Sequence, residues 1–390
     1  MATRLYFDNN ATTAAAPEVL AAMWPFHAEH YGNPSSLHSL GDESARALST
    51  ARAALARLLG AGSPARLVFT SGATEANATA LASALATCGT RRRILTTAVE
   101  HPAVLEPLAH ARERGFEVVV IGVDGEGRVD RERWRSELDE RTALASVMAA
   151  NNETGVIHGV DELVADARRV GALTHVDAVQ ACGKLPLDCE RLGADFVAVS
   201  AHKLHGPKGV GALYIRRGVE LAPFLRGGPQ EDERRGGTEN VPAIVGFGRA
   251  AMLAREWLAG EGPTRLAALR DRLEATLLGA LSEVSIHGRG APRLANTTNL
   301  RVEGVSGEAL VMLASDEGLC ASTGAACSAS RHRPSHVLLA MGLSPAQASS
   351  SVRLSLSRYT TEAEVDAAAE VLVRAAQRLR AVANPLPTAP

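Results

Sequence analysis

Two neighbouring stretches decide the fold: LTHVDAVQ at residues 173–180 and DFVAVSAHKLHGPKG at residues 195–209. Each begins with a short β-rich run, at residues 173–177 and 195–200, of the kind that forms a buried strand. A polar side chain stands where each run ends, Asp177 after the first and Lys203 after the second. In open α/β sheets, ligands bind at the carboxyl ends of the strands. The two stretches therefore predict neighbouring strands with a ligand site at their ends.

Further β-rich runs flank these two, and helix-like segments separate most of them. The runs cover residues 66–70, 93–97, 117–121, 144–149 and 210–215, and the helical patterns include residues 73–86, 104–114 and 160–170. This alternation predicts an α/β fold with a mostly parallel, seven-stranded sheet covered by helices on both faces. The last two runs lie too close for a helical crossover, so we expect the final strand to run antiparallel.

The pattern changes near residue 260. Before the sheet, one helix is expected to begin at Pro17 and another to cover residues 42–59 before Gly60. After residue 260, helical patterns at 264–281 and 361–382 and strands near 299–302 and 318–321 predict a smaller α+β unit. We therefore expect a large domain at residues 15–260, a small domain formed by residues 1–14 and 261–382, and a disordered tail at residues 383–390.

Composition argues against several classes of protein. The 41 basic and 43 acidic side chains nearly balance, which argues against a broad surface for nucleic acid or anionic membranes. The sequence contains no export signal and no uncharged apolar stretch of about 18 residues, so we expect neither export nor a membrane span. The five cysteines are odd in number and lack zinc-like spacing, which favours reduced thiols in the cytoplasm and no metal site.

Lysine is scarce in this chain: only Lys184, Lys203 and Lys208 occur, all within one short stretch. Lys203 follows one predicted strand, and Asp177 ends the strand before it. Pyridoxal phosphate needs such a pair, because a lysine holds the cofactor covalently and an acid keeps its ring nitrogen protonated. A structural ion pair is the alternative interpretation. Lys208, beside glycines, could instead bind a phosphate, and Lys184 is expected to be exposed.

Three other predicted strand ends carry polar residues. The turn SGATE, residues 71–75, opens a helix whose free N–H groups can face a phosphate, although many strand-to-helix turns share this composition. His101 follows the run at 93–97, and Asn152 follows the run at 144–149. Each of these two side chains could bind a ligand or could serve the local structure alone.

Two residues stand out in the C-terminal part. Cys327 lies in STGAACSAS, residues 322–330, where a loop of small residues would leave a thiol reachable. The usual alternative for a lone cysteine is a small core residue. Arg353 alternates with apolar residues in SSVRLSLSR, residues 350–358, like an inward-facing strand position. A buried arginine usually binds a carboxylate.

Taken together, the chain resembles the cysteine desulfurases, which are fold-type I pyridoxal-phosphate enzymes, and is most similar to their nitrogen-fixation type. The resemblance extends from YFDNNATT at residues 6–13 to LSRYTTE at residues 356–362. Between these two stand GNPSSLH, TSGATE, EHPAV, NNETGV, HVDAVQ, HKLHGPKG, RRGGTEN and GAACSAS. The interval from Cys327 to Arg353 matches the long-loop group of the family.

The resemblance implies a role for each matching residue. Lys203 then holds the cofactor and moves the α-proton, His101 stacks on the ring and shuttles protons, and Cys327 is the nucleophile. Arg353 binds the carboxylate of the substrate, with Asn33 assisting. The remaining cofactor contacts are Asp177 at the pyridine nitrogen, Asn152 and Gln180 at the ring oxygen or nearby groups, Ala73, Thr74, Ser200 and His202 at the phosphate, and Thr238 at the phosphate of the neighbouring subunit.

The implied reaction converts L-cysteine to L-alanine and leaves the sulfur on Cys327 as a persulfide. A sulfur-acceptor protein such as an iron–sulfur scaffold, in iron–sulfur cluster or thio-cofactor assembly, and a homodimer are the implied partners. One alternative is a selenocysteine lyase or another β-lyase, which would share Lys203 and Asp177 without needing Cys327; a sulfur carrier without cofactor is another. The chain departs from the family at Ala201, where glycine is usual, and at the basic turn of residues 331–333.

Overall fold

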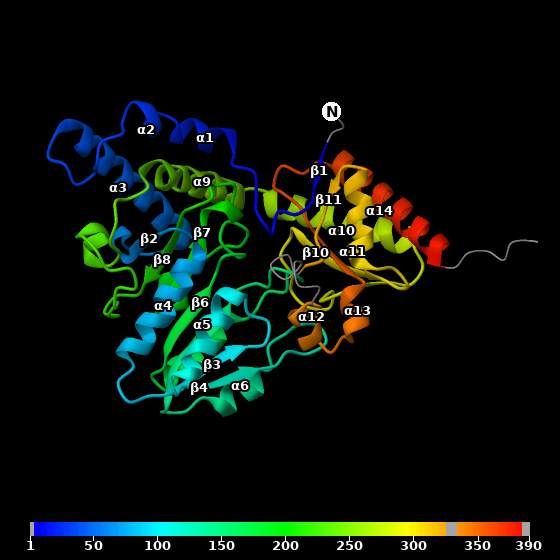
Figure 1. Ribbon diagram of the computed structural model, residues 1–390, viewed down its shortest axis with the longest axis horizontal. Helices are drawn as coiled ribbons and strands as arrows, with labels where there is room; N and C mark the ends of the chain where they lie inside the picture. The colour runs from blue at the N-terminus through cyan, green and yellow to red at the C-terminus, as the bar shows by residue number, and fades with distance from the viewer. Residues whose placement is uncertain (1–3, 325–333, 384–390) are drawn as a thin grey trace, which may run out of the picture.

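The computed structural model describes residues 4–324 and 334–383. Cys327 and the predicted tail from residue 384 onward lie outside the described residues. The chain forms two lobes, a larger one built around a sheet and a smaller one that contains the C-terminal helix (Figure 1). None of the helices in the described part is both long enough and apolar enough to span a membrane.

A seven-stranded sheet forms the centre of the larger lobe, in the order β2-β8-β7-β6-β5-β3-β4. Strands β7, β6, β5, β3 and β4 are parallel neighbours, whereas β8 runs antiparallel to both β2 and β7. The predicted mostly parallel sheet and its antiparallel last strand are therefore confirmed. The strands are β2 (Leu67–Thr70), β3 (Arg93–Thr97), β4 (Glu117–Ile121), β5 (Thr142–Met148), β6 (Leu173–Asp177), β7 (Phe196–Ser200) and β8 (Gly211–Ile215).

Helices cover both faces of this sheet, because successive strand residues point to opposite sides. In β2, Leu67 and Phe69 join the core under α3 (Ser39–Leu59) and α9 (Val241–Ala259), whereas Val68 joins the core under α4 (Ala73–Thr87) and α5 (Pro102–Glu113). The other helices of this lobe are α1 (Pro17–Met23), α2 (Pro25–Ala28), α6 (Arg131–Glu137), α7 (Val160–Arg169) and α8 (Cys189–Leu192), with 3₁₀ turns at Pro64–Arg66, Ala201–Lys203 and Gln230–Glu233.

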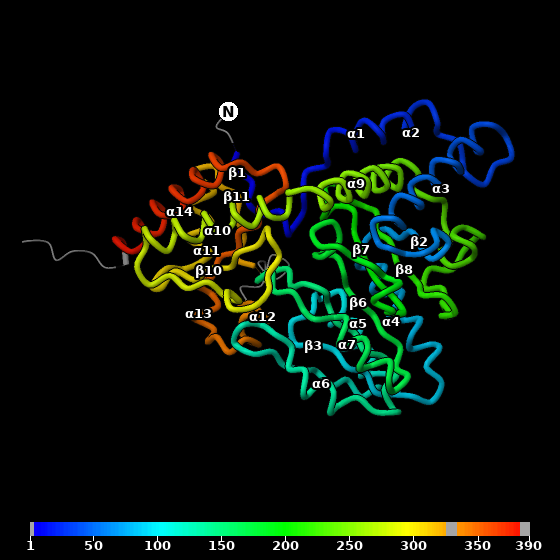
Figure 2. The backbone as a smooth tube through the Cα atoms, turned by 180° about the vertical axis from the view of Figure 1, so that it is seen from behind, coloured from blue at the N-terminus to red at the C-terminus, as the bar shows by residue number. Residues whose placement is uncertain are grey.

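The smaller lobe has its own core, and the N-terminal residues belong to it. Phe7 is buried there with residues of α10 (Gly262–Ala280), α11 (Gly307–Asp316) and α14 (Glu362–Ala383). Figure 2 shows the N-terminal strand beside these helices, on the far side from α3. The sheets of this lobe are antiparallel β12-β10-β9 and parallel β1-β11, formed by β1 (Leu5–Tyr6), β9 (Val284–Ile286), β10 (Thr297–Val302), β11 (Leu319–Cys320) and β12 (Ser351–Ser355); α12 (His336–Ala340) and α13 (Pro345–Ser349) complete it.

Candidate active site

Lys203 and Asp177 meet at the carboxyl ends of neighbouring strands. β6 ends at Asp177, which pairs in register with Ala198 of β7, and the 3₁₀ turn after β7 ends at Lys203. The Lys203 Nζ donates hydrogen bonds to the main-chain oxygens of Asn10, at 2.5 Å, and Ala11, at 2.7 Å. The N-terminal segment therefore crosses from the smaller lobe to supply two acceptors for the lysine.

A buried network fixes the carboxylate of Asp177. Its Oδ2 accepts a hydrogen bond from Asn77 Nδ2 at 2.8 Å, and its Oδ1 accepts one from the Val179 N–H at 3.0 Å. Because the Asn77 amide nitrogen faces Asp177, its oxygen accepts from His175 Nε2, 3.0 Å away. Burial lowers the pKa of His175 to about 4, so this imidazole stays neutral, with Nδ1 facing the Ser146 hydroxyl. Asp177 is thus held as an acceptor for one further donor, such as a protonated ring nitrogen.

The start of α4 offers a cradle for an anion. The N-cap residue of this helix is Gly72, which has no side chain to cap it, so its first N–H groups, at Ala73 and Thr74, are those that a helix leaves without internal partners. The main chain packs closely here, since a Cβ added to Gly211 would lie 2.6 Å from the carbonyl carbon of Gly72. Gly211 also pairs with Ser200, which brings the end of β7 beside the cradle.

Amine, acid and anion cradle together fit pyridoxal phosphate. Asn77 lies one helical turn beyond the start of α4 and bonds Asp177, so one helix links the cradle to the acid. Lys203 stands on the neighbouring strand end. The described residues thus supply an amine for covalent attachment, an acceptor for the ring nitrogen and N–H groups for the phosphate.

His101 is the N-cap of α5 and faces the same site. Its Nδ1 accepts a hydrogen bond from the Ala103 N–H at 3.1 Å, so the neutral ring carries its proton on Nε2. Burial lowers the pKa of His101; the Asp177 charge opposes this shift, and Lys203 and His336 add to it. A neutral imidazole with its proton on Nε2 can donate to, or exchange a proton with, a ligand beside Lys203.

Glu100, the residue before His101, is a fully buried acid that sequence reasoning did not single out. Its Oε1 accepts from the Thr97 hydroxyl at 2.7 Å and from the Met148 N–H at 2.8 Å, while Oε2 has no partner among the described residues. Burial raises the pKa of Glu100 to about 8, and Asp177 adds to the shift. The carboxyl is therefore mostly protonated at neutral pH.

We expect the contribution of Glu100 to the stability of the protein to fall as pH rises from 4.5 to about 8. The ordinary pKa of Glu100 is 4.5, so between pH 4.5 and about 8 the folded state keeps a proton that the unfolded state loses. The free energy of unfolding should decrease by roughly 1.4 kcal/mol per pH unit from this group alone. Glu100→Gln, which mimics the protonated acid, should remove that slope in denaturant titrations at pH 5, 6.5 and 8. Glu106→Gln, at an exposed position of α5, is the control, and equal slopes in all three proteins would contradict the assignment.

The structure corrects one expectation, since Lys184 is not exposed. It is half-buried, and its Nζ donates to Gln180 Oε1 at 2.7 Å and to Asn10 Oδ1 at 3.1 Å. Gln180 Nε2 in turn donates to the Asn10 main-chain oxygen at 3.0 Å, the same atom that accepts from Lys203. The loop after β6 folds back over the N-terminal segment, which buries Lys184 and lowers its pKa well below the ordinary value. The sequence offered one indication that Lys184 belongs to the site, namely that it is one of only three lysines in the chain.

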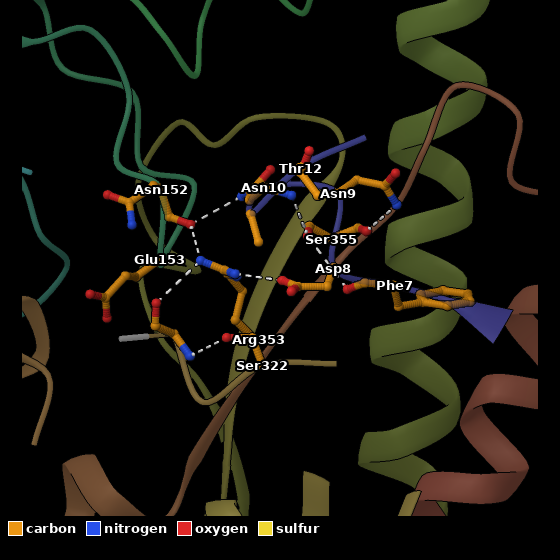
Figure 3. A network of polar contacts seen from close by, with 12 residues as sticks. Phe7, Asp8, Asn9, Asn10, Thr12, Asn152, Glu153, Ser322, Arg353 and Ser355 are labelled. Carbon is orange, nitrogen blue, oxygen red and sulfur yellow. Dashed lines mark hydrogen bonds and ion pairs between the residues drawn. The ribbon is translucent and has the colours of Figure 1, made fainter. Parts of the chain in front are cut away.

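Arg353 enters the site from β12 of the smaller lobe, buried as its sequence pattern predicted. Its Nη1 donates to the main-chain oxygens of Asn152, at 3.1 Å, and Gly324, at 3.2 Å, and its Nη2 lies 2.6 Å from Asp8 Oδ1 (Figure 3). Asn10 Nδ2 also donates to the Asn152 oxygen, at 3.1 Å. Arg353 and Asn10 thus donate to the same oxygen of Asn152, and the main-chain oxygen of Asn10 accepts from Lys203. Hydrogen bonds therefore connect Arg353 to Lys203 through the two asparagines.

Of the other predicted residues, two lie near the site, one is exposed at a distance from it, and one is outside the described residues. His202 lies beside the N-terminal segment, with Nδ1 3.1 Å from the Thr12 hydroxyl, and Thr238 lines a pocket of about 210 Å³ together with Ser71. Asn33 is exposed, and the segment between α2 and α3 that contains it lies at the far end of the larger lobe (Figures 1 and 2). Cys327 lies outside the described residues. Within residues 4–324 and 334–383, no three His, Cys, Asp or Glu side chains are grouped to hold a metal.

Residues 5–368, nearly the whole chain, match the family model described as aminotransferase class-V. The chain belongs to the class-V aminotransferases. This family uses pyridoxal phosphate, in agreement with the amine, acid and cradle of the site. The observed α/β architecture also confirms the predicted fold-type I class.

Relatives place this class-V aminotransferase among the cysteine desulfurases. A curated cysteine desulfurase of Cereibacter sphaeroides is 49% identical over 381 residues, which cover 97% of each chain. A solved NifS-like protein superposes with a TM-score of 0.88 at 39% identity, covering 95% of this chain and 99% of that one. A third relative, SspA in complex with cysteine, has a TM-score of 0.81 at 31% identity and covers 92% of this chain and 100% of that one. The predicted family is confirmed.

Proposed function

We propose that this chain converts L-cysteine to L-alanine with pyridoxal phosphate and transfers the sulfur to Cys327. The observation that carries the proposal is the meeting of Lys203 and Asp177 at neighbouring strand ends, beside the uncapped start of α4. Membership among the cysteine desulfurases supplies the substrate class. The cysteine bound by the similar SspA structure supports the same substrate.

The site residues divide the work of the reaction. When bound, pyridoxal phosphate supplies an electron sink for the pair released at the α-carbon of the substrate. Arg353 holds the substrate carboxylate, and the Lys203 Nζ takes the α-proton and later returns a proton to the product. The main-chain oxygens of Asn10 and Ala11 orient that amine through its N–H groups. His101, neutral with its proton on Nε2, supplies a second proton donor.

Transfer of the sulfur to Cys327 completes the proposed reaction. The thiolate of Cys327 attacks the substrate sulfur, so that an S–S bond forms as the C–S bond breaks. The electron pair of the C–S bond stays with the carbon fragment, which gains a proton and leaves as L-alanine. L-cysteine and the Cys327 thiol thus become L-alanine and a persulfide on Cys327, with no external oxidant or reductant.

The setting proposed for this reaction is a cytoplasmic homodimer that passes sulfur to an acceptor protein, such as an iron–sulfur scaffold. Thr238 would reach the phosphate in the neighbouring subunit, and the exposed Asn33 would approach a substrate only across such an interface. Exposed apolar side chains on α1, between α1 and α2, and between α2 and α3 support an interface at that end of the larger lobe, namely Leu20, Trp24, Tyr31 and Leu37.

Product analysis tests the proposed activity. The cofactor-loaded protein, given L-cysteine and a reducing thiol, should release alanine and sulfide in equal amounts. Pyruvate and ammonia in place of alanine would identify a β-eliminating lyase. Turnover of L-selenocysteine without turnover of L-cysteine would identify a selenocysteine lyase.

A further inference from the structure

The guanidinium of Arg353 already has a carboxylate partner within the chain. Asp8 Oδ1 lies 2.6 Å from Arg353 Nη2, and Figure 3 shows the two side chains facing each other. The Arg353 side chain is 2% exposed and that of Asp8 is 20% exposed, so water screens this pair weakly. The pair occupies the place where the proposed function requires a substrate carboxylate to bind.

Arg353 nevertheless keeps a donor for a ligand. A guanidinium has five N–H donors, and Nη1 gives its two to the main-chain oxygens of Asn152 and Gly324. The Nε is buried and has no partner among the described residues. Buried polar atoms are nearly always paired, so this orphan N–H indicates a ligand. A substrate carboxylate bound to it would lie beside Asp8.

Asp8 is the only acid in contact with Arg353 in the described part of the chain. Glu153 is nearby, but it is fully buried and burial raises the pKa of its carboxyl. Its Oε2 accepts a hydrogen bond from the Ser335 hydroxyl at 2.5 Å. Asp8 therefore supplies the charge that balances Arg353 before a substrate arrives.

We propose that Asp8 is a specificity-determining residue that competes with the substrate carboxylate for Arg353 and thereby sets the affinity for L-cysteine. This inference rests on the proposed function, which places the substrate carboxylate at Arg353. The internal pair holds the guanidinium in position and leaves it no net charge to attract arbitrary anions. A substrate must then gain part of its affinity from contacts other than its carboxylate.

The side chain of Asp8 can be changed without removing its structural contacts. Its main-chain oxygen, not its carboxylate, accepts the N–H groups of Ala11 and Thr12 that form the turn. Asp8→Asn keeps an oxygen acceptor for Arg353 and removes only the charge. We expect this variant to fold.

The test compares ligands with and without a carboxylate. Asp8→Asn should lower the KM for L-cysteine about tenfold, the effect of removing a carboxylate roughly 6 Å away at an effective dielectric constant of about 40. The Kd of 3-mercaptopropionate, which has a carboxylate but no amine, should fall by a similar factor in calorimetry. The KM for L-cysteine methyl ester, which has no carboxylate, should not change.

Two further variants control this experiment. Asp8→Glu keeps the charge, so its KM for L-cysteine should lie closer to the wild-type value than that of Asp8→Asn. Asp42→Asn removes an exposed carboxylate of α3 and should alter none of the three values. An unchanged or raised Kd for 3-mercaptopropionate in folded Asp8→Asn would overturn the proposal. If Asp8→Asn is destabilised, 3-mercaptopropionate should raise its Tm more than that of the wild type. Failure of the wild type to form alanine would instead refute the proposed function, and the calorimetry would still test Asp8.

Discussion

Lys203→Ala is expected to lose at least about a thousandfold of its turnover with L-cysteine, because the group that carries the α-proton is gone. The same change should abolish covalent attachment of pyridoxal phosphate. The chain is well suited to this measurement, since it has only three lysines. Borohydride reduction followed by peptide mapping should link the cofactor of the wild type to Lys203 alone. Modification of the exposed Lys208 or of Lys184 would contradict the assignment.

Mixing subunits extends this experiment to the proposed dimer. If Thr238 completes the phosphate site of the neighbouring subunit, a mixed dimer of Lys203→Ala and Thr238→Ala subunits contains one intact site. Activity should then reappear after the two inactive or impaired proteins are denatured together and refolded. No recovery would place Lys203 and Thr238 in a site formed by one subunit.

The sheet could be predicted from sequence because its strands are short β-rich runs separated by helical patterns. The helix α9 could not be predicted in the same way. It is apolar on nearly all sides, and such a helix is buried without an amphipathic period. Its glycines allow close packing, since a Cβ added to Gly248 would lie 2.6 Å from the Cα of Ala51 in α3. Those glycines weaken the helical signal in the sequence while they stabilise the tertiary contact.

The site was predictable where strand ends determine it, and unpredictable where distant segments meet. Asp177 and Lys203 follow from strand order, because parallel neighbours bring their carboxyl ends together. The contacts of Asp8 with Arg353 and of Asn10 with Lys184 join residues far apart in the chain. No local pattern predicts such contacts, so Lys184 was wrongly expected to be exposed.

Removal of the proposed nucleophile, Cys327, should lower turnover as strongly as removal of Lys203. Cys327→Ala is expected to lower alanine formation from L-cysteine at least about a thousandfold, as loss of a catalytic nucleophile does in other enzymes. Cofactor binding should persist, because Lys203, Asp177 and the start of α4 are unchanged. The measurement is alanine release, together with the visible absorbance of the bound cofactor.

The four described cysteines are poor substitutes for Cys327. Cys182 and Cys189 are buried, and burial raises the pKa of Cys182 to about 12 and that of Cys189 further, so neither forms a thiolate readily. Cys88 follows the C-terminal end of α4, whereas the cradle lies at its start, about 22 Å away along a 15-residue helix. Cys320, in β11, is the matched control, and Cys320→Ala should keep its activity. Unchanged alanine release in Cys327→Ala would show that a thiol other than Cys327 receives the sulfur, whereas pyruvate and ammonia in place of alanine would show β-elimination.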